Sequence, residues 1–175
     1  MTIERFGIVK LRGQDVTVLG ADLKPGEAAP EFTVQNLEWA AFHGLADTQG
    51  KVRIIASVLS LETETCDRET RRFNQEAAAL GKDIAILVIS TDLPYSQKRW
   101  CGAAGMEEQV IVLSDHLTAE FGLKYGLLVK EARVLRRAVF VVDRSGKLTY
   151  VAYMPAFGVE PNYSEVLEAA KAALA

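Results

Sequence analysis

Cys66 and Cys101 are the side chains of this sequence best suited to covalent redox chemistry. A thiol acts as a nucleophile only when it ionises, so the surroundings of each cysteine decide its reactivity. The two are not arranged as CxxC, and only His43 and His116 could add imidazole ligands, which argues against a zinc cluster. A cysteine can also be a small buried apolar residue, so composition leaves a structural role open.

Cys66 follows an apolar run and lies where a helix is predicted to begin. The first turn of a helix offers unpaired backbone N–H groups and the positive end of the helix dipole, and both favour thiolate. Nearby negative charge opposes ionisation, and four acidic residues surround Cys66 in the sequence: Glu62, Glu64, Asp67 and Glu69. A reactive thiol here needs a compensating cation. The local candidates, which a solvated helix face would also explain, are Arg68, Arg71 and Arg72.

Cys101 lies near the end of a second predicted helix, over residues 95–101, which Pro94 opens. The two predicted helices follow adjacent strands and can be neighbours. A disulfide needs Cα atoms within about 7 Å of each other. The layout permits that distance and does not require it.

The elements around the cysteines predict one α/β domain over residues 1–175. Residues 52–58 and 84–89 are near-continuous apolar runs, typical of strands covered on both faces. With a helix predicted over 67–80 between them, they form a βαβ unit, normally right-handed and parallel. Residues 138–142 and 148–153 predict a hairpin, and 164–174 a final helix, with Ser164 as N-cap and Leu167 and Leu174 facing inwards.

The remaining elements are shorter. Residues 7–11 and 16–19 predict an N-terminal hairpin, within an extension over residues 1–20. Short strands are predicted at 32–34 and 110–113, and a short helix at 118–125. A mixed sheet flanked by helices on both faces follows, which is the outline of a thioredoxin-like fold.

Composition excludes several classes of function. The formal net charge is −3 and no basic block is present, which argues against a nucleic-acid partner. No apolar run reaches the ~20 residues that a membrane span needs. The first residues lack the basic-then-apolar order of a secretory signal, so we expect a cytoplasmic protein. No cofactor is expected.

Several segments, in the same order along the chain, resemble the bacterial thiol peroxidases, a subgroup of the atypical 2-Cys peroxiredoxins. SLETETCDRETRRFN at 60–74 is similar to their peroxidatic segment, and STDLPYSQKRWCGAAG at 90–105 to their resolving segment. RRAVFVVD at 136–143 matches the strand with the family's active-site arginine. The opening VxLxGxxVTVxG and the closing EPNY are also similar.

The resemblance implies a role for four residues. Cys66 corresponds to the peroxidatic cysteine and Cys101 to the resolving one, so an intrachain disulfide between them is implied. Thr63 corresponds to the threonine whose hydroxyl bonds thiolate and peroxide. Arg137 corresponds to the conserved arginine and would be the missing cation, whereas Arg136 better fits a surface charge at a strand edge.

The implied activity is an antioxidant one, the reduction of hydrogen peroxide or alkyl hydroperoxides. Attack by Cys66 gives a sulfenic acid, which condenses with Cys101. A thioredoxin-type dithiol then reduces the disulfide. The subgroup also implies a homodimer.

The sequence departs from the family pattern beside Cys66. Leu59 stands where the family has a proline, and leucine excludes water without fixing φ. Glu62 replaces the family aspartate, and Glu64 and Thr65 replace a small or apolar pair. We therefore expect peroxidase activity that is weak or atypical.

Three other functions compete with the peroxidase. A redoxin-fold thiol sensor or binding module would keep both cysteines but form sulfenic acid slowly. A thioredoxin-like disulfide exchanger would carry CxxC, which is absent. A purely structural role for the cysteines leaves the ordered resemblance unexplained.

Overall fold

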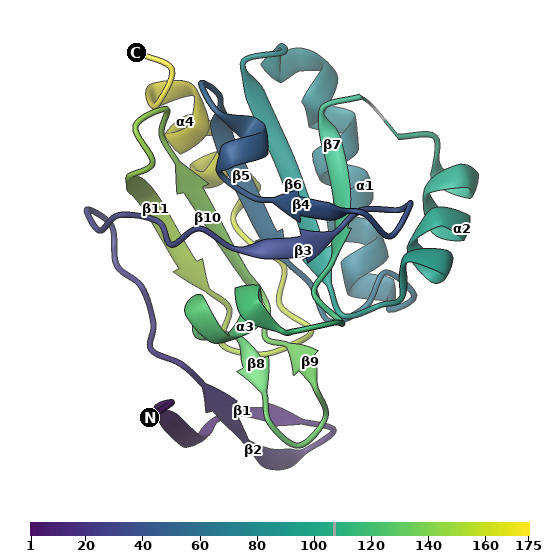
Figure 1. Ribbon diagram of the computed structural model, residues 1–175, viewed down its shortest axis with the longest axis vertical. Coiled ribbons are helices and arrows are strands. Elements are labelled where there is room, and N and C mark those ends of the chain that lie inside the picture. The colour runs from purple at the N-terminus through teal and green to yellow at the C-terminus, as the bar shows by residue number, and fades with distance from the viewer. Residues whose placement is uncertain (107) are drawn as a thin grey trace.

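A seven-stranded mixed sheet in the order β11-β10-β5-β6-β7-β3-β4 lies at the centre of the computed structural model, which describes residues 1–106 and 108–175 (Figure 1). Its strands are β3 (Thr33–Gln35), β4 (Ala41–His43), β5 (Val52–Ser57), β6 (Ile84–Ser90), β7 (Val110–Ser114), β10 (Ala138–Val142) and β11 (Leu148–Tyr153). β5, β6 and β7 are parallel, and the other pairings are antiparallel. The predicted mixed sheet is confirmed.

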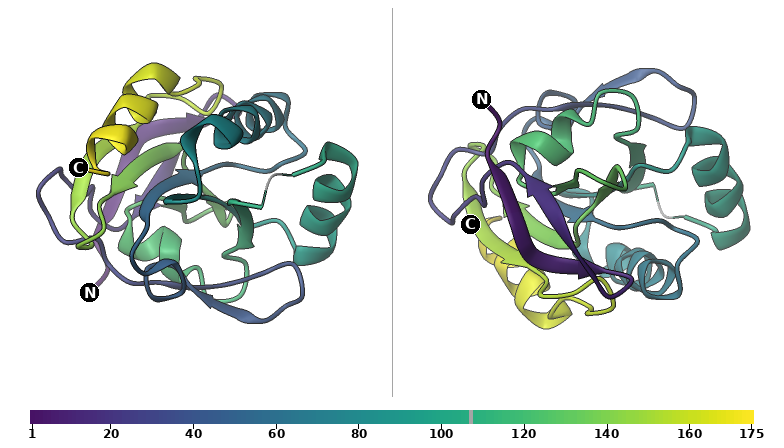
Figure 2. Two further views of the ribbon diagram at one scale, coloured as in Figure 1. Left: turned by 90° about the horizontal axis from the view of Figure 1, so that it is seen from above. Right: turned by 90° about the horizontal axis from the view of Figure 1, so that it is seen from below.

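Helices cover both faces of this sheet (Figure 2). α1 (Glu64–Leu80) and α4 (Tyr163–Ala172) pack over one face, and α3 (Glu120–Lys124) lies on the other. Every residue of β5, β6 and β10 is buried, because layers on both sides exclude water from these strands. This explains the continuous apolar runs of the sequence.

The two helices that carry the cysteines are longer than predicted. α1 begins at Glu64, so Cys66 lies inside its first turn. α2 (Pro94–Ala104) continues past Cys101 and ends where Gly105, at φ 67°, donates its N–H to the Cys101 carbonyl. Glycine adopts this left-handed conformation without strain.

The last helix corrects the predicted N-cap. Asn162, not Ser164, is the N-cap, because its side chain accepts the N–H of Glu165 at 3.3 Å. The fully buried residues of α4 are Val166 and Ala170. Leu167 and Leu174 are partly buried and pack against the same core, as predicted.

The predicted N-terminal hairpin is confirmed as β1 (Glu4–Leu11) and β2 (Gln14–Leu19). Arg12 and Gly13 form its turn with φ of 51° and 79°, the left-handed geometry that tight hairpins require. The sequence did not predict β8 (Leu128–Val129) and β9 (Val134–Leu135), which complete a second sheet in the order β1-β2-β8-β9. A 3-10 turn covers Ala46–Thr48. The assignment of residues 1–175 to one domain stays a prediction.

Candidate active site

Cys66 faces the core and meets a buried cation. Its side chain is 0% exposed, and Nη2 of Arg137 donates a hydrogen bond to its Sγ at 2.9 Å. Arg137 immediately precedes β10, whose partner in the sheet is β5, the strand that leads towards Cys66. Sheet pairing thus brings together two residues that are distant in the sequence. A cation in contact with the sulfur favours the thiolate.

Three acceptors fix the Arg137 side chain. Besides the Cys66 sulfur, Nη1 donates to a carboxylate oxygen of Glu69, and Nε donates to the Phe157 carbonyl at 3.1 Å. Arg137 is 1% exposed, so its hydrogen-bond acceptors lie inside the protein rather than in solvent. This arrangement holds the guanidinium against the sulfur and limits its alternative positions.

The neighbouring Arg136 points elsewhere, but it is not the surface charge that we expected. It is buried, donates to Asp22 at 2.9 Å and stacks over the ring of Tyr153 at 4.6 Å. Adjacent residues of an extended chain point to opposite sides, which explains why only one of the pair reaches Cys66.

The arginines near Cys66 in the sequence do not supply the cation. Arg68, Arg71 and Arg72 lie on the outer side of α1, where each is about half exposed and paired with an acidic side chain. Their partners are Glu64 and Glu160 for Arg68, Asp67 for Arg71, and Glu76 for Arg72.

Glu69 is a site residue that the sequence analysis did not single out for a role. It is fully buried, and burial raises the pKa of its carboxyl to about 7, although Arg137 opposes this shift. It follows Cys66 by three positions, the spacing that places two side chains on one face of a helix. This three-residue spacing is the feature of the sequence that could have indicated a role for Glu69 beside Cys66. The other three acidic side chains point outwards or towards α2. Of the four acidic residues that surround Cys66 in the sequence, Glu69 is therefore the one that lies in the buried site.

Thr63 precedes α1 as its N-cap residue. Its hydroxyl donates to the Ser60 carbonyl at 2.9 Å, within the loop that leads to Cys66. Asp92, at the end of β6, fixes the same loop: it accepts the Ser60 hydroxyl at 2.7 Å and the Leu61 N–H at 2.9 Å. Asp92 therefore positions the loop from the neighbouring strand, a role that the sequence analysis missed.

Cys101 lies on α2, partly buried against the same core as Cys66. Both cysteines are free thiols in this structure. Burial raises the pKa of the Cys101 thiol to about 11, so it is protonated at neutral pH where it stands.

An open groove of about 540 Å³ borders the loop before Cys66. The tip of the N-terminal hairpin forms one side, and the segment between β8 and β9 forms another. Most of the lining comes from apolar atoms, and Leu59, Ser60 and Thr63 form the side nearest to α1.

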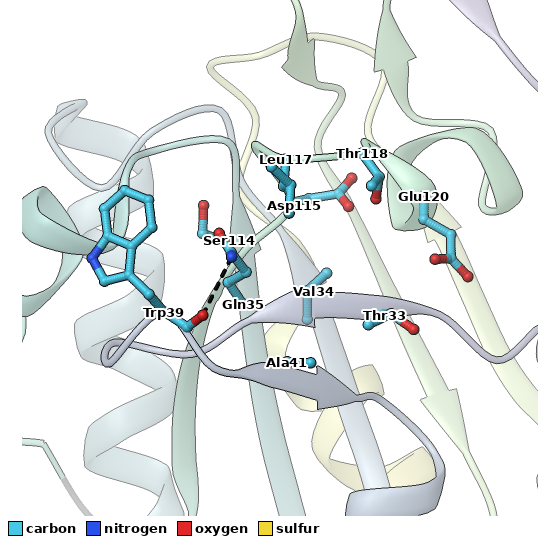
Figure 3. A pocket seen from close by; sticks show the side chains of 10 residues that line it. All are labelled: Thr33, Val34, Gln35, Trp39, Ala41, Ser114, Asp115, Leu117, Thr118 and Glu120. Atoms are coloured by element: carbon cyan, nitrogen blue, oxygen red, sulfur yellow. Dashed lines mark hydrogen bonds between the residues drawn. The ribbon is translucent and has the colours of Figure 1, made fainter.

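A second hollow, of about 460 Å³, shares no lining residue with this groove and lies beside β3 (Figure 3). Trp39 stands at one end of it and Glu120 at the other. Within residues 1–106 and 108–175, His, Cys, Asp and Glu side chains form no group that could hold a metal ion. No helix in this part of the chain is long and apolar enough to cross a membrane.

The known proteins that this chain is similar to include thiol peroxidases and a peroxiredoxin-like protein. Residues 24–167 match the family model described as Redoxin. A thiol peroxidase of Oceanobacillus iheyensis is 48% identical over 91% of this chain and 95% of its own, and one of Bacillus subtilis is 46% identical over 94% and 96%. The crystal structure of a peroxiredoxin-like protein from Aquifex aeolicus superposes with a TM-score of 0.85 at 35% identity, covering 98% of each chain. A thiol peroxidase from Chromobacterium violaceum shares the fold, with a TM-score of 0.80 at 19% identity over 94% of this chain and 95% of its own.

Proposed function

This chain belongs to the redoxin family and is a thiol peroxidase, and we propose that Cys66 is the cysteine that attacks the peroxide. One observation carries the proposal: the hydrogen bond from Arg137 to the Cys66 sulfur, in a site shielded from water. Arg137 supplies the cation that an active thiol needs beside the acidic Glu69. No other thiol in the chain has a cationic contact of this kind among the described residues.

The first step is a displacement at oxygen. The Cys66 thiolate attacks one peroxide oxygen, an S–O bond forms, the O–O bond breaks, and the departing oxygen takes a proton to leave as water or an alcohol. Arg137 and the N–H groups of the first turn of α1 stabilise the charge that moves onto that oxygen. The Thr63 hydroxyl, now bonded to Ser60, turns to the peroxide when one binds.

Cys101 completes the cycle as the resolving cysteine. Its sulfur attacks the Cys66 sulfenic acid to form an intrachain disulfide, with release of water. A thioredoxin-type dithiol reduces this disulfide by exchange. Such a cycle suits a reducing compartment, and we place the protein in the cytoplasm.

The groove beside Leu59 supports alkyl hydroperoxides as substrates besides hydrogen peroxide. Its mostly apolar lining would bind a hydrocarbon tail through burial, while Thr63 marks the end nearest to Cys66. Because Cys66 is 0% exposed, side chains of residues 59–63 have to move aside before a peroxide oxygen reaches the sulfur, while the loop backbone keeps its course.

We also propose a homodimer that forms through an aromatic patch, defined as Trp39, Tyr95, His116 and Leu117. The Trp39 ring lies 5.0 Å from that of Tyr95 and 5.3 Å from that of His116. Trp39 and Leu117 line the same hollow (Figure 3). Tyr95 and Leu117 are 73% and 67% exposed. Large apolar side chains gathered on a surface mark protein interfaces.

Single substitutions of each cysteine test the chemistry. We expect Cys66→Ser to abolish the consumption of cumene hydroperoxide and hydrogen peroxide. Cys101→Ser should still react once and then retain a sulfenic acid that dimedone labels at Cys66. Stopped-flow assays with thioredoxin and its reductase, together with intact-mass measurement, follow both results.

Arg72→Gln is the matched control, since Arg72 is half exposed and its ion pair with Glu76 and its contact with the Tyr163 ring involve none of the four proposed site residues. It should behave as wild type. Peroxide consumption by Cys66→Ser, or a wild-type protein that dimedone never labels at Cys66, would instead favour a thiol sensor or a different nucleophile.

A further inference from the structure

A side-chain hydrogen bond lies between the two helices that carry the cysteines, next to both thiols. Nε1 of Trp100 on α2 donates to Oδ1 of Asp67 on α1 at 2.7 Å, and we name this contact the Asp67–Trp100 bridge. Asp67 directly follows Cys66, and Trp100 directly precedes Cys101. The bridge therefore links the two neighbours of the residues that have to form the disulfide.

Arg71 contacts both residues of the Asp67–Trp100 bridge. The single Nε–H of Arg71 is shared between the two carboxylate oxygens of Asp67, at 2.9 and 3.0 Å. The Arg71 guanidinium also lies 5.3 Å from the centre of the Trp100 ring. Burial alone would raise the pKa of Asp67, but the hydrogen bonds from Arg71 and Trp100 outweigh it and hold that pKa below its ordinary value. Trp100 is 7% exposed and packs in the same core as Cys66. The Asp67 side chain is 35% exposed, so the bridge lies at the edge of this core. A hydrogen bond to an ionised acceptor is shorter and stronger than one between neutral groups.

The bridge and the disulfide require different orientations of the helices. Successive side chains of an α-helix point about 100° apart. While Asp67 faces α2, Cys66 faces Arg137. Cys101 is the next residue after Trp100, so helix geometry turns its side chain about 100° from the one that contacts α1. A disulfide needs both Cβ atoms pointing at each other. Turning or unwinding the helices by that amount separates Asp67 from Trp100.

We propose that the Asp67–Trp100 bridge holds the enzyme in its peroxide-reactive form and has to open before Cys101 can reach Cys66. Asp67 and Trp100 are thus positioning residues for the second chemical step. The inference rests on the proposed function, with Cys66 as nucleophile and Cys101 as resolving residue. Opening the bridge also brings Cys101 towards water, which relieves the burial that now keeps it protonated.

The step that the bridge controls is the condensation of the sulfenic acid. The Cys101 sulfur attacks the Cys66 sulfur, the S–S bond forms and the S–O bond breaks. The hydroxide that leaves combines with the Cys101 proton as water, so the Cys66 sulfur is reduced and the Cys101 sulfur oxidised. While the bridge is closed, a second peroxide can oxidise the waiting sulfenic acid to sulfinic acid.

Trp100→Phe tests the bridge, because phenylalanine keeps an aromatic ring beneath Arg71 and removes only the N–H donor and the second ring. After one equivalent of hydrogen peroxide, rapid quenching with an alkylating reagent measures disulfide formation. We expect it to be about three- to tenfold faster than in wild type, as the loss of one hydrogen bond predicts. The rate of peroxide consumption should change less than twofold, and sulfinic acid should accumulate only at higher peroxide concentrations.

Tyr150→Phe is the matched control, since it also removes one side-chain donor to a carboxylate, that of Glu165, in a contact between β11 and α4 that involves neither cysteine helix. It should leave both steps as in wild type. Asp67→Asn supplies a second route, because it keeps the shape of the acceptor and removes its charge. Asp67→Asn should accelerate disulfide formation less than Trp100→Phe does. If Trp100→Phe does not fold, the rate of disulfide formation in Asp67→Asn tests the proposal in its place.

The double variant Asp67→Asn/Trp100→Phe measures whether the two residues act through one contact. Its disulfide rate should equal that of Trp100→Phe, since a bond that is already broken cannot be weakened further. Additive effects, or single variants whose disulfide rate equals wild type, overturn the proposal. A wild-type protein that consumes peroxide but forms no Cys66–Cys101 disulfide would overturn the proposed function as well, and the wild-type trace alone reveals that case.

Discussion

The Arg137 side chain joins a thiol and a carboxylate inside the protein, so its charge serves two partners at once. Removing Arg137 alone would leave Glu69 buried without a counter-ion and endanger the fold. The paired variant Arg137→Gln/Glu69→Gln removes both charges while it keeps side chains that can bond each other. Reactivity and folding can therefore be separated at this position.

We expect Arg137→Gln/Glu69→Gln to fold and to react with peroxide at least about 100-fold more slowly than wild type, because a positioned donor at a developing charge contributes this much. Circular dichroism checks the fold, and stopped-flow kinetics with hydrogen peroxide checks the rate. A folded double variant that retains more than a tenth of the wild-type rate would show that the cation at Cys66 is not Arg137.

Glu69 should also make stability depend on pH. Its folded pKa of about 7 lies above the ordinary value of 4.5, so the native state holds the proton more tightly than the unfolded state between these values. The stability that this proton provides is complete below about pH 4.5 and is lost as pH rises through about 7. Arg137 reduces this effect, and Glu160 adds to it.

Urea unfolding of Cys66→Ser and Cys66→Ser/Glu69→Gln at pH 5 and pH 8 measures the effect with the thiol absent. Glu69→Gln leaves the Arg137 charge unpaired at both pH values, so the change in stability between them is compared and not its absolute value. Between the two pH values, the protein that retains Glu69 should lose about 2–3 kcal/mol relative to the one that lacks it. Parallel stability curves for the two proteins would mean that Glu69 is ionised throughout.

At the scale of elements, the loop between β5 and α1 controls access to Cys66. Asp92 fixes its middle through Ser60 and Leu61, whereas Leu59 occupies the bend before it. Among the described residues the Leu59 N–H has no hydrogen-bond acceptor. A proline at this position would therefore lose no bond, and it would restrict the backbone of the unfolded chain.

We expect Leu59→Pro to raise the free energy of unfolding by about 0.4–1 kcal/mol and to speed the peroxide reaction about two- to fivefold, because a pre-organised loop needs less ordering in the transition state. Denaturant titration and stopped-flow kinetics check both. Leu59→Ala, which frees the loop and thins the groove wall, should instead slow the reaction with cumene hydroperoxide. If Leu59→Pro unfolds more easily than wild type, the backbone at residue 59 is not compatible with proline.

The elements also show what the sequence could predict. The strands β5 and β6 and the helix between them follow from long apolar runs and one amphipathic pattern, which are local signals. β8 and β9 have two residues each, and only their pairing with β2 and with each other makes them strands. The contact of Arg137 with Cys66 could be inferred only by resemblance. Asp92 was missed because its role depends on the loop that β5 places beside it.

At the scale of the whole molecule, exposed apolar side chains gather in two separate places. The aromatic patch lies around the β3–β4 hairpin and the start of α2, and Phe6 with Ile8 lies on the N-terminal hairpin. The first place also contains a hollow of about 460 Å³ into which a side chain of a partner could pack. A dimer through this patch would hold the start of α2, the helix that has to move when Cys101 reacts.

Leu117→Glu tests this interface because the Leu117 side chain is 67% exposed, so the charge costs the monomer little. We expect wild type to be dimeric in a light-scattering concentration series and Leu117→Glu to dissociate at a concentration at least tenfold higher, since a buried unpaired carboxylate opposes association. Phe6→Glu places the same charge on the other exposed cluster and should leave the dimer intact. If Phe6→Glu dissociates the dimer and Leu117→Glu does not, the interface lies on the N-terminal hairpin. The start of α2 would then be outside the interface throughout the catalytic cycle.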